Sequence, residues 1–207
     1  AVSYAAVPIL DSNHEISGHI AILDIKPLVN EDWIRSILEA YASFVSLELE
    51  RRQTQDTIEV LTKGYGLPLG KDCFKQLVQI AGDTFDTDFA FIGQHSNTDR
   101  RVIETTAIYH RGKFLTPLSY SLDNAPCDTV VGKQSEAIPS GIQALCPNFP
   151  LLDELDAEAY IGVPLFDSNN LSIGVFAIIN KTPIDHPERI KMLLHAFANK
   201  AAYEIER

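Results

Sequence analysis

Residues 160–180 read YIGVPLFDSNNLSIGVFAIIN, and this stretch decides the fold. Two β-prone runs, residues 160–166 and 172–180, flank an Asp-Ser-Asn-Asn segment of the kind that favours turns. The pattern therefore predicts an antiparallel hairpin with a loop of about four residues. Apolar residues then recur at helical spacing from 190 to 201, which predicts a helix with one buried face. Asp185, followed three residues later by Glu188, is the predicted N-cap of that helix.

The same pattern occurs at the start of the chain. Residues 4–51 align without a gap with residues 160–207, and 17 of the 48 aligned positions are identical. We interpret the two copies as an internal repeat, because chance rarely produces such agreement. The second copy closes a longer unit, whereas almost nothing precedes the first. The repeat thus predicts the last third of one domain at 1–53, a helical linker at 54–68 and a complete domain at 69–207.

The helix of the first copy is expected to begin after Asn30 and to continue to about Lys63. Its predicted buried face consists of Ile34, Ile37, Leu38, Tyr41, Phe44 and Val45. The residues predicted to break it are Gly64, Gly66, Pro68 and Gly70. Its polar middle leaves two interpretations open, a solvated connector or a dimerising signalling helix. The first hairpin would expose unpaired strand edges, so we expect a homodimer formed through the helices and this N-terminal unit.

The remaining chain alternates helical and extended patterns. The predicted elements are a helix at 71–85, strands at 89–93, 102–109 and 118–122, a short helix at 124–131 capped by Asn124, a strand at 137–138, and short helical turns within 143–155. Short strands between helices in this order predict an α+β fold with an antiparallel sheet.

The amino-acid composition argues against several classes of function. The 207 residues carry 17 Lys and Arg against 28 Asp and Glu, a net charge of −11, which argues against a nucleic-acid binder or a basic membrane-surface patch. No apolar run reaches the length of about 20 residues that spans a bilayer. The three cysteines are odd in number and far apart, which indicates free thiols and a cytoplasmic protein.

Several motifs resemble the GAF domain, a small-molecule-sensing relative of the PAS domain. They are Ala125-Pro126-Cys127-Asp128, Pro147-Asn148-Phe149-Pro150, the segment AEAYIGVPL at 157–165 and the segment IGVFAI at 173–178. The resemblance implies a central antiparallel sheet of about six strands with helices on one face and long loops over a ligand cavity on the other. It also implies a tandem-GAF region of a bacterial signalling protein, with the effector domain outside this chain.

The known GAF chemistries differ in the residues that they need. Bilin attachment uses a Cys often followed by His, and no Cys-His pair occurs here. Asn180-Lys181 matches only the start of the cyclic-nucleotide signature. A bilin, haem or metal cofactor is therefore not expected, and no catalytic residue is assigned. The alternatives are a redox enzyme of the free methionine sulfoxide reductase type and a structural GAF domain without a ligand.

If a pocket exists, one face of each strand and the loops should line it. The predicted lining residues are Phe91, Ile103, Thr105, Tyr109, Tyr120, Cys127, Val130, Phe149, Tyr160, Gly162 and Phe176. Their aromatic rings could stack on a planar ligand or simply fill the core. The sequence leaves the identity of the small molecule open.

Overall fold

The computed structural model describes residues 3–10, 16–65 and 70–207. The chain divides into two compact units, Ala1–Glu59 and Val60–Arg207. The predicted turn at residues 11–13 of the first copy and the predicted helix breakers Gly66 and Pro68 lie outside the described residues.

The first unit is a hairpin followed by a long helix. Strand β1 (Ser3–Leu10) pairs antiparallel with β2 (Ile16–Asp24), and α1 runs from Glu31 to Tyr65. The Asn30 carbonyl accepts the first helical hydrogen bond, from the Ile34 N–H at 3.1 Å. The helix continues through Gly64, so the predicted break at that residue is wrong. Glycine only weakens a helix, by about 1 kcal/mol relative to alanine.

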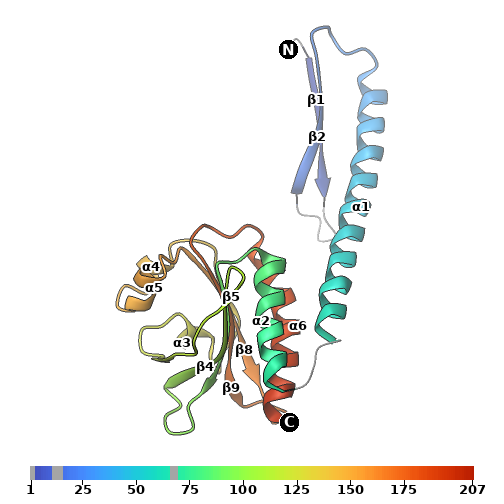
Figure 1. The fold of residues 1–207 in the computed structure, drawn as a ribbon. Coiled ribbons are helices and arrows are strands. Elements are labelled where there is room, and N and C mark those ends of the chain that lie inside the picture. The colour runs from blue at the N-terminus through green and yellow to red at the C-terminus, as the bar shows by residue number, and fades with distance from the viewer. Residues whose placement is uncertain (1–2, 11–15, 66–69) are drawn as a thin grey trace. The chain divides into compact units, whose positions relative to one another are not determined.

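The second unit contains one antiparallel sheet. Its strands are β3 (Phe89–His95), β4 (Val102–His110), β5 (Lys113–Phe114), β6 (Ser119–Ser121), β7 (Glu136–Ile138), β8 (Ala159–Phe166) and β9 (Ser172–Asn180). Its helices are α2 (Lys71–Phe85), α3 (Cys127–Val130), α4 (Ile142–Leu145), α5 (Pro150–Glu154) and α6 (Pro187–Glu206). The strand order is β5-β4-β3-β9-β8-β7, with β6 paired to β4. Figure 1 shows this sheet with α2 and α6 beside it. The expected α+β fold with a central antiparallel sheet is confirmed.

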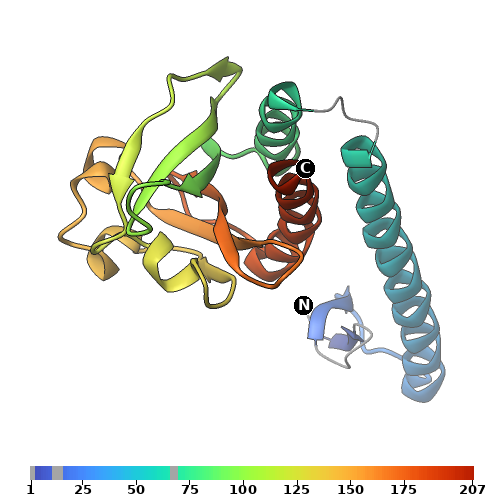
Figure 2. The same cartoon turned by 90° about the horizontal axis from the view of Figure 1, so that it is seen from below.

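The two faces of this sheet have different covers. Helices α2 and α6 lie along one face, whereas the segment with α3, α4 and α5 lies over the other (Figure 2). One apolar core fills each interface, and strand β8 is buried along nearly its whole length. Burial on both faces explains why β8 and β9 read as almost continuous apolar runs rather than as an alternating pattern.

Two predicted helix caps are wrong. Helix α6 begins at Pro187, and its N-cap is His186 in the left-handed conformation rather than Asp185. Proline suits this first position because its missing N–H has no partner in the first turn. Helix α3 begins only at Cys127, after Pro126, while Asn124 adopts the left-handed conformation of a turn.

The two copies of the repeat fold into the same local structure. Tyr4 pairs with Leu23 in the first hairpin, and the equivalent Tyr160 pairs with Ile179 in the second. Each hairpin has a register shift at the equivalent place, between Ile9 and Leu10 and between residues 165 and 166. A long helix follows both hairpins. The sequence similarity therefore extends to strand register and to an irregularity.

The helices of the two copies differ in the burial of their equivalent residues. Tyr41 and Phe44 of α1 are 62% and 66% exposed, so their prediction as buried residues is wrong. Phe197, the α6 equivalent of Tyr41, is 1% exposed because it packs against Phe176 of the sheet and Phe85 of α2. The described α1 residues that pack against the hairpin of the first unit are Ile34, Leu38, Ala42 and Val45. No described helix is long and apolar enough to cross a membrane.

Asp88 joins three elements where β3 begins. Its N–H donates to Asn180 Oδ1 at 3.1 Å, at the end of β9. Its carboxylate accepts the Lys181 N–H at 2.8 Å and the Arg111 Nε–H at 2.5 Å. Burial by itself raises the pKa of Asp88, but the Lys181 and Arg111 contacts outweigh burial and leave the pKa below its ordinary value.

This carboxylate should make stability depend on acid pH. A folded-state pKa below the unfolded value of about 3.9 contributes stability that is present above that pH and lost as pH falls through the folded value. We expect Asp88→Asn to lower stability at pH 7 and to flatten the loss of stability below about pH 4. Urea unfolding at pH 7 and pH 3 measures both effects, with Asp153→Asn, an exposed position on α5, as control. Equal pH profiles for Asp88→Asn and the parent chain would contradict this role.

Candidate ligand-binding cavity

A cavity of about 90 Å³ lies between the sheet and the segment that covers it. Its walls are almost wholly apolar. The lining residues are Phe89, Phe91, Thr105, Ile108, Leu115, Thr116, Leu118, Tyr120, Pro126, Cys127, Phe149, Leu151, Leu152, Leu155, Tyr160 and Ile179. Leu115 and Leu118 are partly exposed, so the cavity comes nearest to solvent beside the loop that follows β5.

Sheet geometry provides the floor of the cavity. Alternate residues of a strand point to the same face, so Phe89 and Phe91 of β3 both line the cavity. Tyr160 of β8 and Ile179 of β9 are paired neighbours and complete the floor. Phe89 and Ile179 were absent from the predicted set. A period of two from the predicted Phe91 indicates Phe89, whereas the predicted Phe176 lies on the opposite face of β9 from Ile179.

Six of the eleven predicted residues line the cavity, namely Phe91, Thr105, Tyr120, Cys127, Phe149 and Tyr160. Ile103 and Val130 are fully buried in the same core but do not line the cavity. Tyr109 and Phe176 belong to the core on the opposite face, beneath α2 and α6.

A bulge explains the placement of Tyr109. Ile92 pairs with Ala107, whereas the next residue, Gly93, pairs with Thr105. The extra residue, Thr106, reverses the alternation along β4, so Thr105 and Ile108 face the cavity while Tyr109 faces α2. Tyr109 Oη accordingly donates to Asp83 Oδ1 of α2 at 2.6 Å.

Phe176 follows the regular alternation of residues 174–180 of β9, after the bulge at Ile173. Val175, Ala177 and Ile179 belong to the core on the cavity side, and Phe176 and Ile178 belong to the core on the helix side. Its ring meets Phe197 of α6, with ring centroids 6.4 Å apart. Phe176 therefore packs the helices onto the sheet.

Gly162 affects the shape of the cavity because it has no side chain. It lies two residues after Tyr160 on the same face of β8, and a Cβ atom at Gly162 would overlap the Tyr160 hydroxyl and ring. The glycine leaves room for the tyrosine ring to lie along the strand. Tyr160 is fully buried in that position.

Two tyrosine hydroxyls meet one sulfur atom in the cavity wall. Tyr120 Oη donates to Cys127 Sγ at 3.1 Å, and Tyr160 Oη donates to the same sulfur at 3.2 Å. Burial raises the pKa of the Cys127 thiol, and the two hydrogen bonds offset this only in part. Burial, together with the nearby sulfur, also raises the pKa of both tyrosines well above its ordinary value. All three groups therefore stay neutral at physiological pH.

Thr105 ties the covering loop to the sheet. Its Oγ1 donates to the Leu118 carbonyl at 2.9 Å and accepts the Leu118 N–H at 2.7 Å. The Thr105 hydroxyl therefore makes its hydrogen bonds within the protein. The lining residues on this side of the cavity come from loops that lie far from the strands in the sequence. Loops have no regular periodicity, so the sequence pattern gave little indication of these residues.

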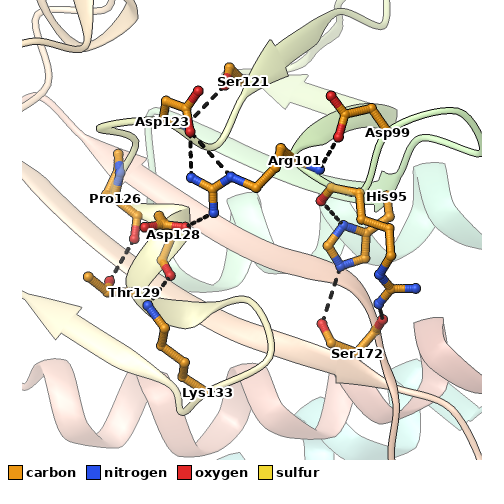
Figure 3. A network of polar contacts seen from close by, with 11 residues as sticks. His95, Asp99, Arg101, Ser121, Asp123, Pro126, Asp128, Thr129, Lys133 and Ser172 are labelled. Atoms are coloured by element: carbon orange, nitrogen blue, oxygen red, sulfur yellow. Dashed lines mark hydrogen bonds and ion pairs between the residues drawn. The ribbon is translucent and has the colours of Figure 1, made fainter.

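An ionic network joins the start of α3 to Arg101, the residue before β4 (Figure 3). The Arg101 guanidinium, at the start of β4, lies 2.5 Å from Asp123 Oδ1 and 2.5 Å from Asp128 Oδ1 of α3. Lys133 Nζ donates to the Asp128 carbonyl at 2.8 Å. Since Cys127 precedes Asp128, these contacts also position the sulfur in the cavity wall. Arg101 interacts with carboxylates on both sides of the turn into α3.

The structure also places the residues that a cyclic nucleotide or a metal ion would need. Asn180 and Lys181, the start of a cyclic-nucleotide signature, bind Asp88 at the end of β9 and do not line the cavity. Within the described part of the chain, no three His, Cys, Asp or Glu side chains gather as metal ligands.

Solved structures with similar folds are GAF domains and phytochrome fragments. The chromophore-binding domain of an unusual bacteriophytochrome from R. palustris is 8% identical with a TM-score of 0.58, and the match covers 75% of this chain and 62% of that one. The corresponding domain of Stigmatella aurantiaca phytochrome P1 is 9% identical with a TM-score of 0.56, covering 73% and 59%. The chain therefore spans less than two thirds of either domain.

A third similar structure is matched over most of its length. The GAF domain of an Acinetobacter phosphoenolpyruvate-protein phosphotransferase is 16% identical with a TM-score of 0.57, covering 74% of this chain and 92% of that one. Identities this low establish the fold alone. No curated protein matches the sequence. The family model of the GAF domain matches residues 71–205, so the chain belongs to the GAF domain family.

Proposed function

We propose that residues 69–207 form a non-catalytic sensory unit that holds a small, uncharged, apolar molecule in the cavity. The observation that carries this proposal is the chemistry of the wall. It is almost wholly apolar, and three of its four hydroxyls, at Thr105, Tyr120 and Tyr160, already bond to the protein. A charged ligand would lose its hydration there without compensation, which is costly.

The volume of the cavity limits the size of the ligand. Pockets for drug-sized ligands measure about 300–1,000 Å³, whereas a cavity of about 150 Å³ accepts benzene. The 90 Å³ present here favours a molecule no larger than benzene. Two similar structures are described as chromophore-binding domains. The residues here do not fit a bilin, because a tetrapyrrole is several times larger than the cavity.

The thiol chemistry argues against the redox alternative. Burial raises the pKa of Cys73, Cys127 and Cys146, so each stays a neutral thiol near pH 7. Reduction of a sulfoxide by cysteine needs a reactive thiolate, which environments with a lowered pKa provide. This supports a binding role over an enzymatic one.

The repeat supports a second part of the proposal, that residues 1–53 are the last third of another GAF unit and 54–68 a helical linker. The shared strand register, the equivalent bulge and the following helix all favour it. The chain would then be a fragment of a tandem-GAF signalling protein, whose effector activity lies in another domain.

Filling the cavity provides the test. We expect benzene, used as the probe at ten times its dissociation constant, to stabilise the full chain by about 1.4 kcal/mol. Leu155→Phe places extra carbon atoms in the cavity wall and should abolish that gain. Leu171→Phe, exposed in the turn between β8 and β9, is the matched control and should keep it. Thermal unfolding with and without benzene measures the effect, and native mass spectrometry of the purified chain would reveal a resident molecule.

Three outcomes would overturn the ligand proposal. Equal stabilisation of the parent chain and Leu155→Phe would place the probe elsewhere. No stabilisation and no excess mass would favour a structural GAF domain without a ligand. Turnover of free methionine sulfoxide by the purified chain with a thiol reductant would favour the redox enzyme.

A further inference from the structure

The exposed part of the cavity wall is confined to one segment of the chain. Three lining residues are exposed, namely Leu115, Thr116 and Leu118, and every other lining residue is buried or half-buried. All three belong to residues 115–118, which connect β5 to β6 and are called the entrance segment below. Because each of these residues meets both the cavity and solvent, the wall is only one side chain thick here.

Hydrogen bonds attach the entrance segment to β4 only at its two ends. At one end the Leu115 N–H donates to the Ile108 carbonyl at 3.0 Å, and at the other end Leu118 bonds to Thr105. The two residues between these ends make no hydrogen bond to any other residue that the structure describes. The segment therefore crosses the bulge at Thr106 without support from the sheet. Segments with so few hydrogen bonds open locally at low cost.

The attachment at Leu118 depends largely on one side chain. The Thr105 N–H and the Thr105 Oγ1–H both donate to the Leu118 carbonyl at 2.9 Å, and the Leu118 N–H donates to Oγ1 at 2.7 Å. The Thr105 side chain is buried and lines the cavity, because the bulge in β4 turns it to that face. The hydroxyl thus takes part in two of the three hydrogen bonds that hold this end of the segment.

We propose that a ligand enters and leaves the cavity through the entrance segment, and that Thr105 is the positioning residue that keeps this segment closed. The inference rests on the proposed ligand-binding role of the cavity and adds the route and its control. Opening at this place moves side chains that are already partly exposed, such as Leu115 and Leu118. The α5 side of the wall is less suitable, because Leu152 there is 1% exposed and belongs to the apolar core.

Amide hydrogen exchange measures the opening without any ligand. The N–H of residue 105 is a suitable reporter, because its acceptor is the Leu118 carbonyl whatever the side chain at position 105. We expect this N–H to exchange about 30-fold faster in Thr105→Val, the factor that corresponds to two hydrogen bonds of typical net strength. Thr105→Ser keeps the hydroxyl and should restore slow exchange, after correction for the intrinsic rate of each residue type.

A matched control removes a hydroxyl from the next residue of β4. Thr106 Oγ1 accepts a hydrogen bond from Gln94 Nε2 at 3.1 Å, and Thr106 does not line the cavity. Thr106→Val should therefore leave exchange at residue 105 unchanged. The Ile161 N–H, in the middle of the buried strand β8, reports unfolding of the whole unit. It should remain the slower of the two amides in every variant, which shows that the opening is local.

The kinetics of benzene binding test the route. An entrance that opens more often admits and releases the ligand equally, because the closed segment covers both the empty and the filled cavity. We expect Thr105→Val to raise the association and dissociation rates of benzene together, with a dissociation constant unchanged within about threefold. Nuclear magnetic resonance of benzene exchange measures both rates. Thr105→Ser and Thr106→Val should keep the rates of the parent chain.

The possible outcomes separate the latch from the ligand. Unchanged amide exchange at residue 105 in Thr105→Val would overturn the closing role of Thr105. Faster amide exchange with unchanged benzene rates would place the entrance in another part of the wall. A weaker dissociation constant with an unchanged association rate would make Thr105 a ligand contact instead. If benzene does not bind the parent chain, the proposed function fails, whereas amide exchange still decides whether Thr105 holds the segment closed.

Discussion

Tyr160→Ala is expected to destabilise the complete unit by about 3–5 kcal/mol, the range measured for loss of a large buried ring. Tyr160 is fully buried, and its ring fills the space beside Gly162. Removing it would join that space to the existing cavity and leave the Cys127 sulfur with one hydrogen-bond donor fewer. Urea unfolding followed by circular dichroism measures the loss.

The matched control separates the ring from its hydroxyl. Tyr160→Phe keeps the ring and removes only the hydrogen bond to Cys127, so we expect a loss of about 0.5–1.5 kcal/mol. Similar losses for the two variants would mean that the hydroxyl, and not the packing of the ring, dominates at this position.

Gly174→Ala is expected to cost about 3 kcal/mol, near the upper end for overpacking in a core. Gly174 lies in β9, where a Cβ atom would overlap the Gly93 carbonyl oxygen and lie 3.0 Å from Gln94 Cα. These are backbone atoms of the paired strand β3, so they cannot move aside as a flexible side chain would. The sheet itself would have to shift.

Gly18 is a natural control, because it is the equivalent glycine of the first copy. A Cβ atom there meets only Ile9 Cδ1, at an ordinary contact distance of 3.6 Å. We expect Gly18→Ala to change stability by no more than about 0.5 kcal/mol. Unfolding of both variants in urea provides the comparison. A large loss for Gly18→Ala as well would mean that the glycine is required by the hairpin rather than by the close approach of β3.

The order of elements in the second unit followed from patterns within single segments. The alternation around residues 160–180 and the helical spacing after residue 190 depend only on neighbouring residues, and both predicted elements formed. The repeat likewise indicated that residues 3–10 and 16–24 pair as residues 159–166 and 172–180 do. Local periodicity contains this information because a strand or helix repeats every few residues.

Tertiary structure decided which of these residues share a site. The bulge at Thr106 turned Tyr109 toward α2, and no property of the β4 sequence marks that reversal. The meeting of Tyr120 and Tyr160 at Cys127 depends on three segments far apart in the chain.

The exposure of Tyr41 and Phe44 on α1 is a second case in which the local sequence pattern was insufficient to predict burial. Tyr41 and Phe44 have the spacing of a buried face, and the equivalent Phe197 is indeed buried. An amphipathic pattern shows which residues can be buried, whereas burial itself needs a second surface against that face. The sequence by itself therefore determined the elements and their family, and the packing of distant segments decided the cavity and the exposure of Tyr41 and Phe44 on α1.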